Sequence, residues 1–169
     1  MKRILAIILS LVFILTFAAC GNEPDGNNNG TSKNPNEPGY FFTVNGVKVE
    51  MNVLASSVTD ALGEPTTYTE ETSCAFEGLD KTYGYGGYYI TTYPDGDKDY
   101  IYSAWFVDDS VATSENIYIG STKADVEAAY GEDCFGDSNT AALKKGNTEL
   151  KIILTDDVVS SIQYQAIVE

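Results

Sequence analysis

Histidine is absent from this sequence of 169 residues, which removes the commonest general base and the commonest metal ligand. Basic residues are scarce as well, because 10 Lys and Arg stand against 25 Asp and Glu, for a net charge of −15. Phosphate backbones and anionic membrane surfaces repel such a chain, so we expect no nucleic-acid partner. The acidity favours solubility and a cationic partner. No spacing of the remaining residues marks a catalytic centre, and we expect a non-enzymatic protein without cofactor or metal.

Cysteine is the next scarce residue, with only Cys20, Cys74 and Cys134 in the chain. In an exported protein Cys74 and Cys134 can form a disulfide. They can equally remain single, buried apolar residues. The sequence leaves both possibilities open.

The N-terminus carries an export signal. Lys2 and Arg3 precede an apolar run over 4–17, which is shorter than the roughly 20 residues of a membrane-spanning helix. Ala18-Ala19-Cys20 then resembles the bacterial lipobox, in which the signal peptide is cut before a cysteine that carries diacylglycerol. The resemblance implies a signal peptide over 1–19, fatty acylation (palmitate) of Cys20, and a lipid anchor at the extracellular face of a bacterial cell membrane. The alternative is an ordinary secretory signal cleaved near Ala19.

A polar tract follows the anchor. Residues 21–39 contain Asn, Gly and Pro but no aliphatic or aromatic side chain. Such a stretch buries too little apolar surface to offset the entropy of ordering it, so we expect 20–39 to be an acylated, disordered tether. The remaining residues, 40–169, have the length of one domain or of two small halves.

The chain after the tether contains an internal repeat. Residues 57–64 align with 125–132 at a constant offset of 68 positions (125 minus 57), and both segments are predicted as short helices. Ser56 or Ser57 is expected to cap the first helix, and Ser121 or Thr122 the second. Thr122 and Asp125 also have the spacing of a capping box, with Asp in place of the usual Glu. Just beyond the two ends, Gly63 and Gly131 are expected in the left-handed conformation.

Strand patterns surround both helices. The predicted strands are 81–85, 88–93 and 99–107 after the first helix, and 140–144, 148–154 and 158–168 after the second. Turn residues join the last two of each set, at Pro94-Asp95-Gly96 and at Asp156-Asp157. Upstream, Asn45-Gly46 predicts a hairpin between 41–44 and 47–51, and 117–119 is expected as the first strand of the second half.

The short helix with its glycine end resembles known lipoprotein families. Three segments are similar to segments of the small SmpA/OmlA-type lipoproteins of outer-membrane assembly: Leu62-Gly63-Glu64-Pro65, Tyr130-Gly131-Glu132 and the step Ile119-Gly120-Ser121-Thr122. The duplication resembles the beta-lactamase inhibitor protein (BLIP) and its relatives. These resemblances imply an α+β fold of two tandem repeats, each a short helix (or helical hairpin) plus an antiparallel β-meander, over 40–109 and 110–169. They imply a binding function, with no catalytic residue to transfer.

Alternation along the strands predicts two faces of the sheet. The more apolar side of the last strand is expected to pack on the helices. It consists of Val158, Ser160, Ile162, Tyr164 and Ala166. The halves superpose Ser103 on Ser161 and Trp105 on Gln163. This places Ile101, Ser103 and Trp105 on the open face. Leu150, Ile152 and Leu154 are expected to point inward, which sends Tyr89, Thr91 and Tyr93 to the open face as well.

The expected open face is rich in aromatic residues. Seven of the 12 tyrosines fall between Tyr83 and Tyr102. Exposed Tyr and Trp are typical of protein interfaces, so the sequence predicts a partner-binding face made of Tyr89, Tyr93, Ile101, Ser103 and Trp105. Three alternatives stay open: aromatic pairs that only stabilise the sheet, a carbohydrate-binding (cell-wall) module, and a structural or assembly lipoprotein of the envelope.

One segment imitates a calcium loop. Residues 95–99 begin like an EF-hand, but the sixth and twelfth loop positions are Tyr100 and Phe106 in place of Gly and Glu. We therefore expect a solvated hairpin turn there.

Overall fold

A computed structural model describes residues 38–168, so the predicted signal peptide, Cys20 and most of the tether lie outside the described residues. Two helices and nine strands follow one another in this part of the chain. They are β1 (Phe41–Val44), β2 (Val47–Glu50), α1 (Ala55–Leu62), β3 (Thr67–Thr72), β4 (Leu79–Gly84), β5 (Tyr88–Asp95), β6 (Lys98–Phe106), α2 (Lys123–Tyr130), β7 (Thr140–Lys145), β8 (Thr148–Thr155) and β9 (Val158–Ala166).

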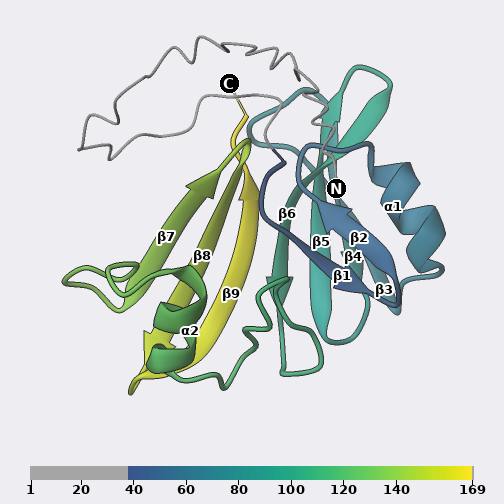
Figure 1. The fold of residues 1–169 in the computed structure, drawn as a ribbon. Coiled ribbons are helices and arrows are strands. Elements are labelled where there is room, and N and C mark those ends of the chain that lie inside the picture. The colour runs from purple at the N-terminus through teal and green to yellow at the C-terminus, as the bar shows by residue number, and fades with distance from the viewer. Residues whose placement is uncertain (1–37, 169) are drawn as a thin grey trace, which may run out of the picture. The chain divides into compact units, whose positions relative to one another are not determined.

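Seven strands form one antiparallel sheet in the order β3-β4-β5-β6-β9-β8-β7. The last strand of the first set, β6, pairs with the last strand of the second, β9, so the two predicted meanders join in a single sheet. Both helices and the β1-β2 hairpin lie on one side of this sheet (Figure 1). The predicted α+β class is confirmed, with strands predominating.

The β1-β2 hairpin has the predicted turn. Asn45 and Gly46 both have positive φ, at 50° and 80°, as a two-residue turn of type I′ requires. The Asp156-Asp157 turn between β8 and β9 has the same property, with φ of 52° and 60°. The other predicted turn is shorter than expected, because Pro94 and Asp95 belong to β5 and the turn is Gly96-Asp97.

The two helices end alike but begin differently. Gly63 and Gly131 both have positive φ, at 82° and 107°, as predicted. Their ψ values are extended, however, so both adopt a conformation largely restricted to glycine rather than the left-handed helical one. The expected serine cap of α1 is wrong. Its N-cap is Leu54, without a side-chain cap, and the Ser57 hydroxyl instead donates to the Leu54 carbonyl at 2.6 Å.

Helix α2 has the predicted capping box. The Thr122 side chain accepts from the Asp125 backbone N–H at 3.2 Å, and the Asp125 carboxylate accepts from the Thr122 N–H at 2.9 Å. Thr122→Ala is therefore expected to lower the free energy of unfolding by about 1 kcal/mol. Urea titration followed by circular dichroism measures this change. Ser56→Ala, at an exposed helical serine, is the control, and an equal loss in that variant would contradict the role of the cap.

Two β-bulges change the alternation of side chains. Thr91 pairs with Ser103 and Thr92 with Ile101, so Tyr102 is an extra residue on β6. Likewise Ile153 pairs with Ser161 and Leu154 with Val159, so Ser160 is an extra residue on β9. Because of the extra residue, the side chains before it lie on the opposite face from the one that strict alternation predicts.

The prediction for β9 is therefore right beyond the bulge and wrong before it. Ile162, Tyr164 and Ala166 are buried as expected. Val158 and Ser160 are exposed, whereas Val159 is 1% exposed and belongs to the core. On β8, where no residue is inserted, Leu150, Ile152 and Leu154 point inward as predicted.

Two further parts of the structure differ from what the sequence predicts. Residues 117–119 form a loop, because the Ile117 N–H donates back to the Thr113 hydroxyl and Asn116 turns with φ of 65°. Ile117 is buried without being part of a strand. Strand β3 was not predicted, since all six of its residues are exposed and show no apolar alternation.

The core lies between the sheet and the elements that cover it. Phe42 of β1 is fully buried, and its ring centroid lies 5.6 Å from Tyr88, 5.0 Å from Phe106 and 5.2 Å from Tyr164. These three rings belong to β5, β6 and β9. The hairpin therefore packs across the junction of the two strand sets, where α1 adds Val58.

Buried tyrosines make the fold sensitive to alkali. Burial raises the pKa of Tyr88 to about 12 and raises that of Tyr164 as well. A phenol whose pKa is higher in the folded than in the unfolded protein contributes its full stabilisation below about pH 10, the ordinary pKa of tyrosine. This stabilisation is lost as the pH rises toward 12. We expect stability to fall over that window, with phenolate absorbance appearing on unfolding. Tyr88→Phe should flatten the decline, and a decline that Tyr88→Phe leaves unchanged would contradict this origin.

Candidate binding face

The side of the sheet opposite the helices and the hairpin, here called the outer face, carries the predicted aromatic residues. On β5 the burial alternates strictly, with Tyr88, Ile90 and Thr92 in the core and Tyr89, Thr91 and Tyr93 half-buried on the outer face. On β6, Trp105 is half-buried beside them. No helix covers this face among residues 38–168 (Figure 1).

Tyr89 and Trp105 form one stacked pair. They are directly opposite on β5 and β6, with ring centroids 5.1 Å apart and planes inclined by 11°. On the far side of Tyr89, a Cβ at Gly84 would approach the Tyr89 ring to 2.6 Å. Glycine at position 84 thus leaves room for the Tyr89 ring beside β4.

A second group of rings lies at the other end of β5. Tyr93 stacks on Tyr100 at 5.7 Å and contacts Tyr102 edge-on at 6.0 Å. Phe76, from the β3–β4 loop, lies 4.9 Å from Tyr93. The Tyr93 hydroxyl donates to the Asn52 side-chain oxygen at 3.0 Å. Burial, followed by the charge of Asp95, raises the pKa of Tyr93.

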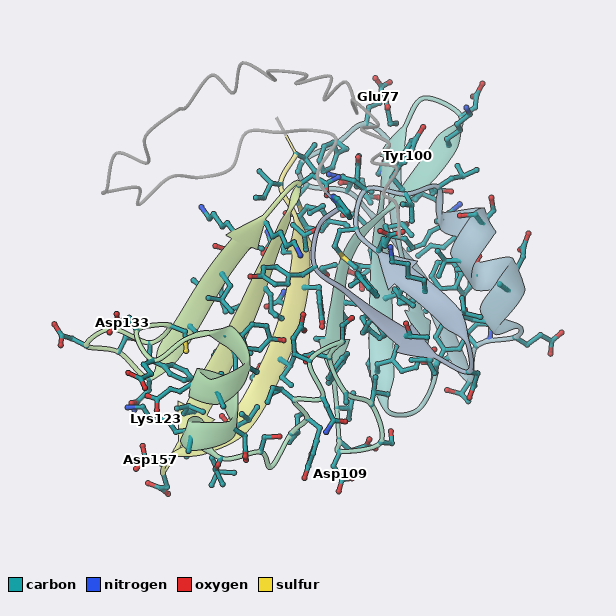
Figure 2. All side chains as sticks on the ribbon, viewed as in Figure 1. Glu77, Tyr100, Asp109, Lys123, Asp133 and Asp157 are labelled. Carbon is teal, nitrogen blue, oxygen red and sulfur yellow. The ribbon has the colours of Figure 1, made fainter. Side chains whose placement is uncertain are left out.

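The six outer-face rings of both groups are called the aromatic patch below: Phe76, Tyr89, Tyr93, Tyr100, Tyr102 and Trp105. Figure 2 shows Tyr100 and Glu77 at one end of the sheet and Asp109 and Asp157 at the other.

The structure corrects two of the five predicted partner-binding residues. Ile101 lies before the Tyr102 bulge, so it points to the helix side and is fully buried in the core. Ser103 is on the outer face but only 6% exposed, and its hydroxyl lies 2.7 Å from that of Thr91. Tyr89, Tyr93 and Trp105 are the three with ring surface left for a partner.

Comparison with family models, curated proteins and solved structures finds no match to this chain. Its function therefore rests on the geometry of its own residues.

Three members of the aromatic patch were missed by the sequence reasoning. Tyr102 is the bulge residue, and Tyr100 precedes the bulge, so strict alternation assigns it to the wrong face. Phe76 lies in a loop without periodicity. The local excess of tyrosine was the signal that could have identified the first two.

Polar side chains border the aromatic patch on β9 and β8. Gln163 lies opposite Trp105, and Lys151 lies opposite Gln163 on the next strand. The Gln165 amide donates to the Tyr102 hydroxyl at 3.0 Å. A groove of about 310 Å³ runs here between Phe76, Tyr102 and Glu149. An aromatic centre with a polar rim is the usual composition of a protein-binding surface.

Both cysteines in the described residues are free. Cys74 is exposed in the β3–β4 loop, whose Phe76 packs on the outer face. Cys134 is half-buried against the core, and burial raises the pKa of its thiol. Both cysteines are thus single, but neither is the fully buried apolar residue that the second possibility describes.

Neither helix among residues 38–168 is long and apolar enough to cross a membrane.

Proposed function

We propose that this protein is an extracellular lipoprotein, acylated at Cys20 and held at the bacterial cell membrane, whose α+β domain binds another protein without catalysis. The aromatic patch is the binding surface, and Tyr89, Tyr93 and Trp105 are its contact residues. The observation that carries the proposal is the half-buried Trp105–Tyr89 stack on a face that no described helix covers. Large rigid rings of this kind form the centres of protein interfaces.

We also propose that residues 40–109 and 110–169 are tandem repeats, as in the families that the sequence resembles. The bulges support this relation. Tyr102 and Ser160 are both inserted residues, and they match at the same offset of 58 (160 minus 102) that superposes Trp105 on Gln163. The buried residues Ile101 and Val159 match as well.

The pairing of β6 with β9 is consistent with a local twofold axis between the halves. A twofold axis that exchanges β6 and β9 must pass through a cross-strand pair whose two members are equivalent residues, 58 positions apart in the chain. Trp105 and Gln163 are such equivalents, and they lie directly opposite one another. Trp105 therefore stands at the centre of the sheet, where the two proposed repeats meet.

Capture of a partner tests the proposal. A soluble fragment of residues 40–169 is incubated with a cell-surface extract, and retained proteins are identified by mass spectrometry. We expect one protein that the Trp105→Ala/Tyr93→Ala fragment does not retain. Equal capture by both fragments would contradict the proposed face. An envelope-assembly lipoprotein would instead show altered envelope integrity on deletion, and a carbohydrate module would change its tryptophan fluorescence with glycans alone.

A further inference from the structure

Strand β3 is an open edge of the sheet. It pairs with β4 on one side, and no described residue pairs with its other side. All six residues, Thr67–Thr72, are exposed. Alternate backbone N–H and C=O groups of an edge strand point outward, so β3 offers a row of unpaired hydrogen-bonding groups to another extended chain.

Carboxylates lie on both faces of this edge. Glu70 and Glu71 are neighbours, so their side chains point to opposite sides of the sheet. Glu71 lies directly opposite Asp80 on β4, which places two like charges side by side. One oxygen of the Asp80 carboxylate is buried and has no hydrogen-bond partner among the described residues. Neither Glu71 nor Asp80 forms an ion pair within residues 38–168.

An acidic cleft adjoins the edge on the helix side. A cavity of about 700 Å³ lies between α1 and β4, lined by four carboxylates (Asp60, Glu64, Asp97 and Asp99) and two lysines. One lysine, Lys81, is already paired with Asp99 at 2.6 Å. The buried hydroxyl of Tyr85, another lining residue, has no partner among the described residues.

Edge and cleft form a continuous surface. Tyr68 of β3 lies 5.0 Å from Tyr83 of β4, which lines the cleft. Glu70 is the cross-strand neighbour of Lys81, another lining residue.

We propose that the β3 edge, with the adjoining cleft, binds an extended peptide segment of a partner protein that carries adjacent basic residues. The segment adds to the sheet as an eighth strand outside β3. Adjacent basic residues point to opposite faces, so one pairs with Glu70 and the cleft and the other with Glu71 and Asp80. The two glutamates repel a second β3 edge, so the complementary strand is a basic one.

Peptide binding to the full chain in detergent micelles tests this proposal. The probe is a fluorescein-labelled peptide, Thr-Val-Thr-Lys-Lys-Val-Thr-Val, and the readout is fluorescence anisotropy. We expect saturable binding that Glu70→Gln/Glu71→Gln weakens about tenfold, as the loss of two cross-strand charge pairs predicts. The control, Asp156→Asn/Asp157→Asn, removes the same charge from the turn between β8 and β9 and should bind as the wild type does.

A second probe separates strand addition from general charge attraction. The same peptide methylated on alternate backbone nitrogens keeps its charge but loses the donors of one edge, and we expect it not to bind. Equal binding of the methylated peptide, or equal weakening by both double variants, would overturn the proposal. Binding of a neutral chitin oligosaccharide in the cleft without peptide binding would also overturn it. The peptide assay contains no partner protein, so its outcome is decided separately from capture by the aromatic patch.

Discussion

Phe42→Ala is expected to lower the free energy of unfolding by about 3–5 kcal/mol, out of about 5–15 kcal/mol for a domain of this size. Phe42 is fully buried and contacts aromatic rings of β5, β6 and β9. Truncation leaves a cavity between three rings that come from both strand sets. The surrounding rings are fixed by their own strands, so the cavity collapses only in part and the loss falls at the upper end of the range for core residues.

Phe41→Ala is the matched control for this prediction. Phe41 precedes Phe42 on the same strand but is only half-buried, where its ring lies under the Lys48 ammonium at 4.1 Å. We expect a loss of about 1 kcal/mol for this variant. Urea titration of both variants measures the difference. Similar losses in the two variants would contradict the role of the hairpin as the packing element between the halves.

Trp105→Ala is expected to weaken capture of the partner protein by about 30-fold or more, because central tryptophans of interfaces contribute about 2 kcal/mol or more. The same change removes the stack with Tyr89, so we also expect a loss of about 1 kcal/mol in stability. Titration of the identified partner against immobilised protein measures the affinity, and circular dichroism verifies the fold.

Two variants separate binding from stability in this experiment. Trp105→Phe keeps a ring over Tyr89 and should retain more affinity than Trp105→Ala. Tyr118→Ala removes another exposed aromatic side chain, which lines a groove beside α2 on the helix side of the sheet, and should bind normally. Normal affinity in Trp105→Ala would show that the partner contacts another surface.

Local signals made much of the fold predictable. Asn45-Gly46 identified the hairpin, Thr122 with Asp125 identified the start of α2, and the strands β5, β8 and β9 were predicted nearly at their bounds. These features depend on residues close together in the sequence. Strand β3 could not be predicted, because its residues are polar and its pairing depends on a sheet edge that forms only in the tertiary structure.

The candidate site was predictable only as far as alternation held. Tyr89 and Tyr93 on β5 were placed correctly, since β5 has no inserted residue. Trp105 lies beyond the β6 bulge and was also placed correctly. Ile101 lies before it and was assigned to the wrong face. A bulge follows from the pairing of two strands, so no local pattern around Tyr102 indicates it.

Site-specific photocrosslinking on intact cells tests most directly whether the outer face contacts a partner protein. A photoreactive amino acid is placed at Gln163, opposite Trp105 on the outer face, and separately at Asp157 in the β8–β9 turn. We expect illumination to join one protein to the Gln163 position and none to the Asp157 position. An adduct of equal yield from Asp157, or no adduct from Gln163, would contradict the account.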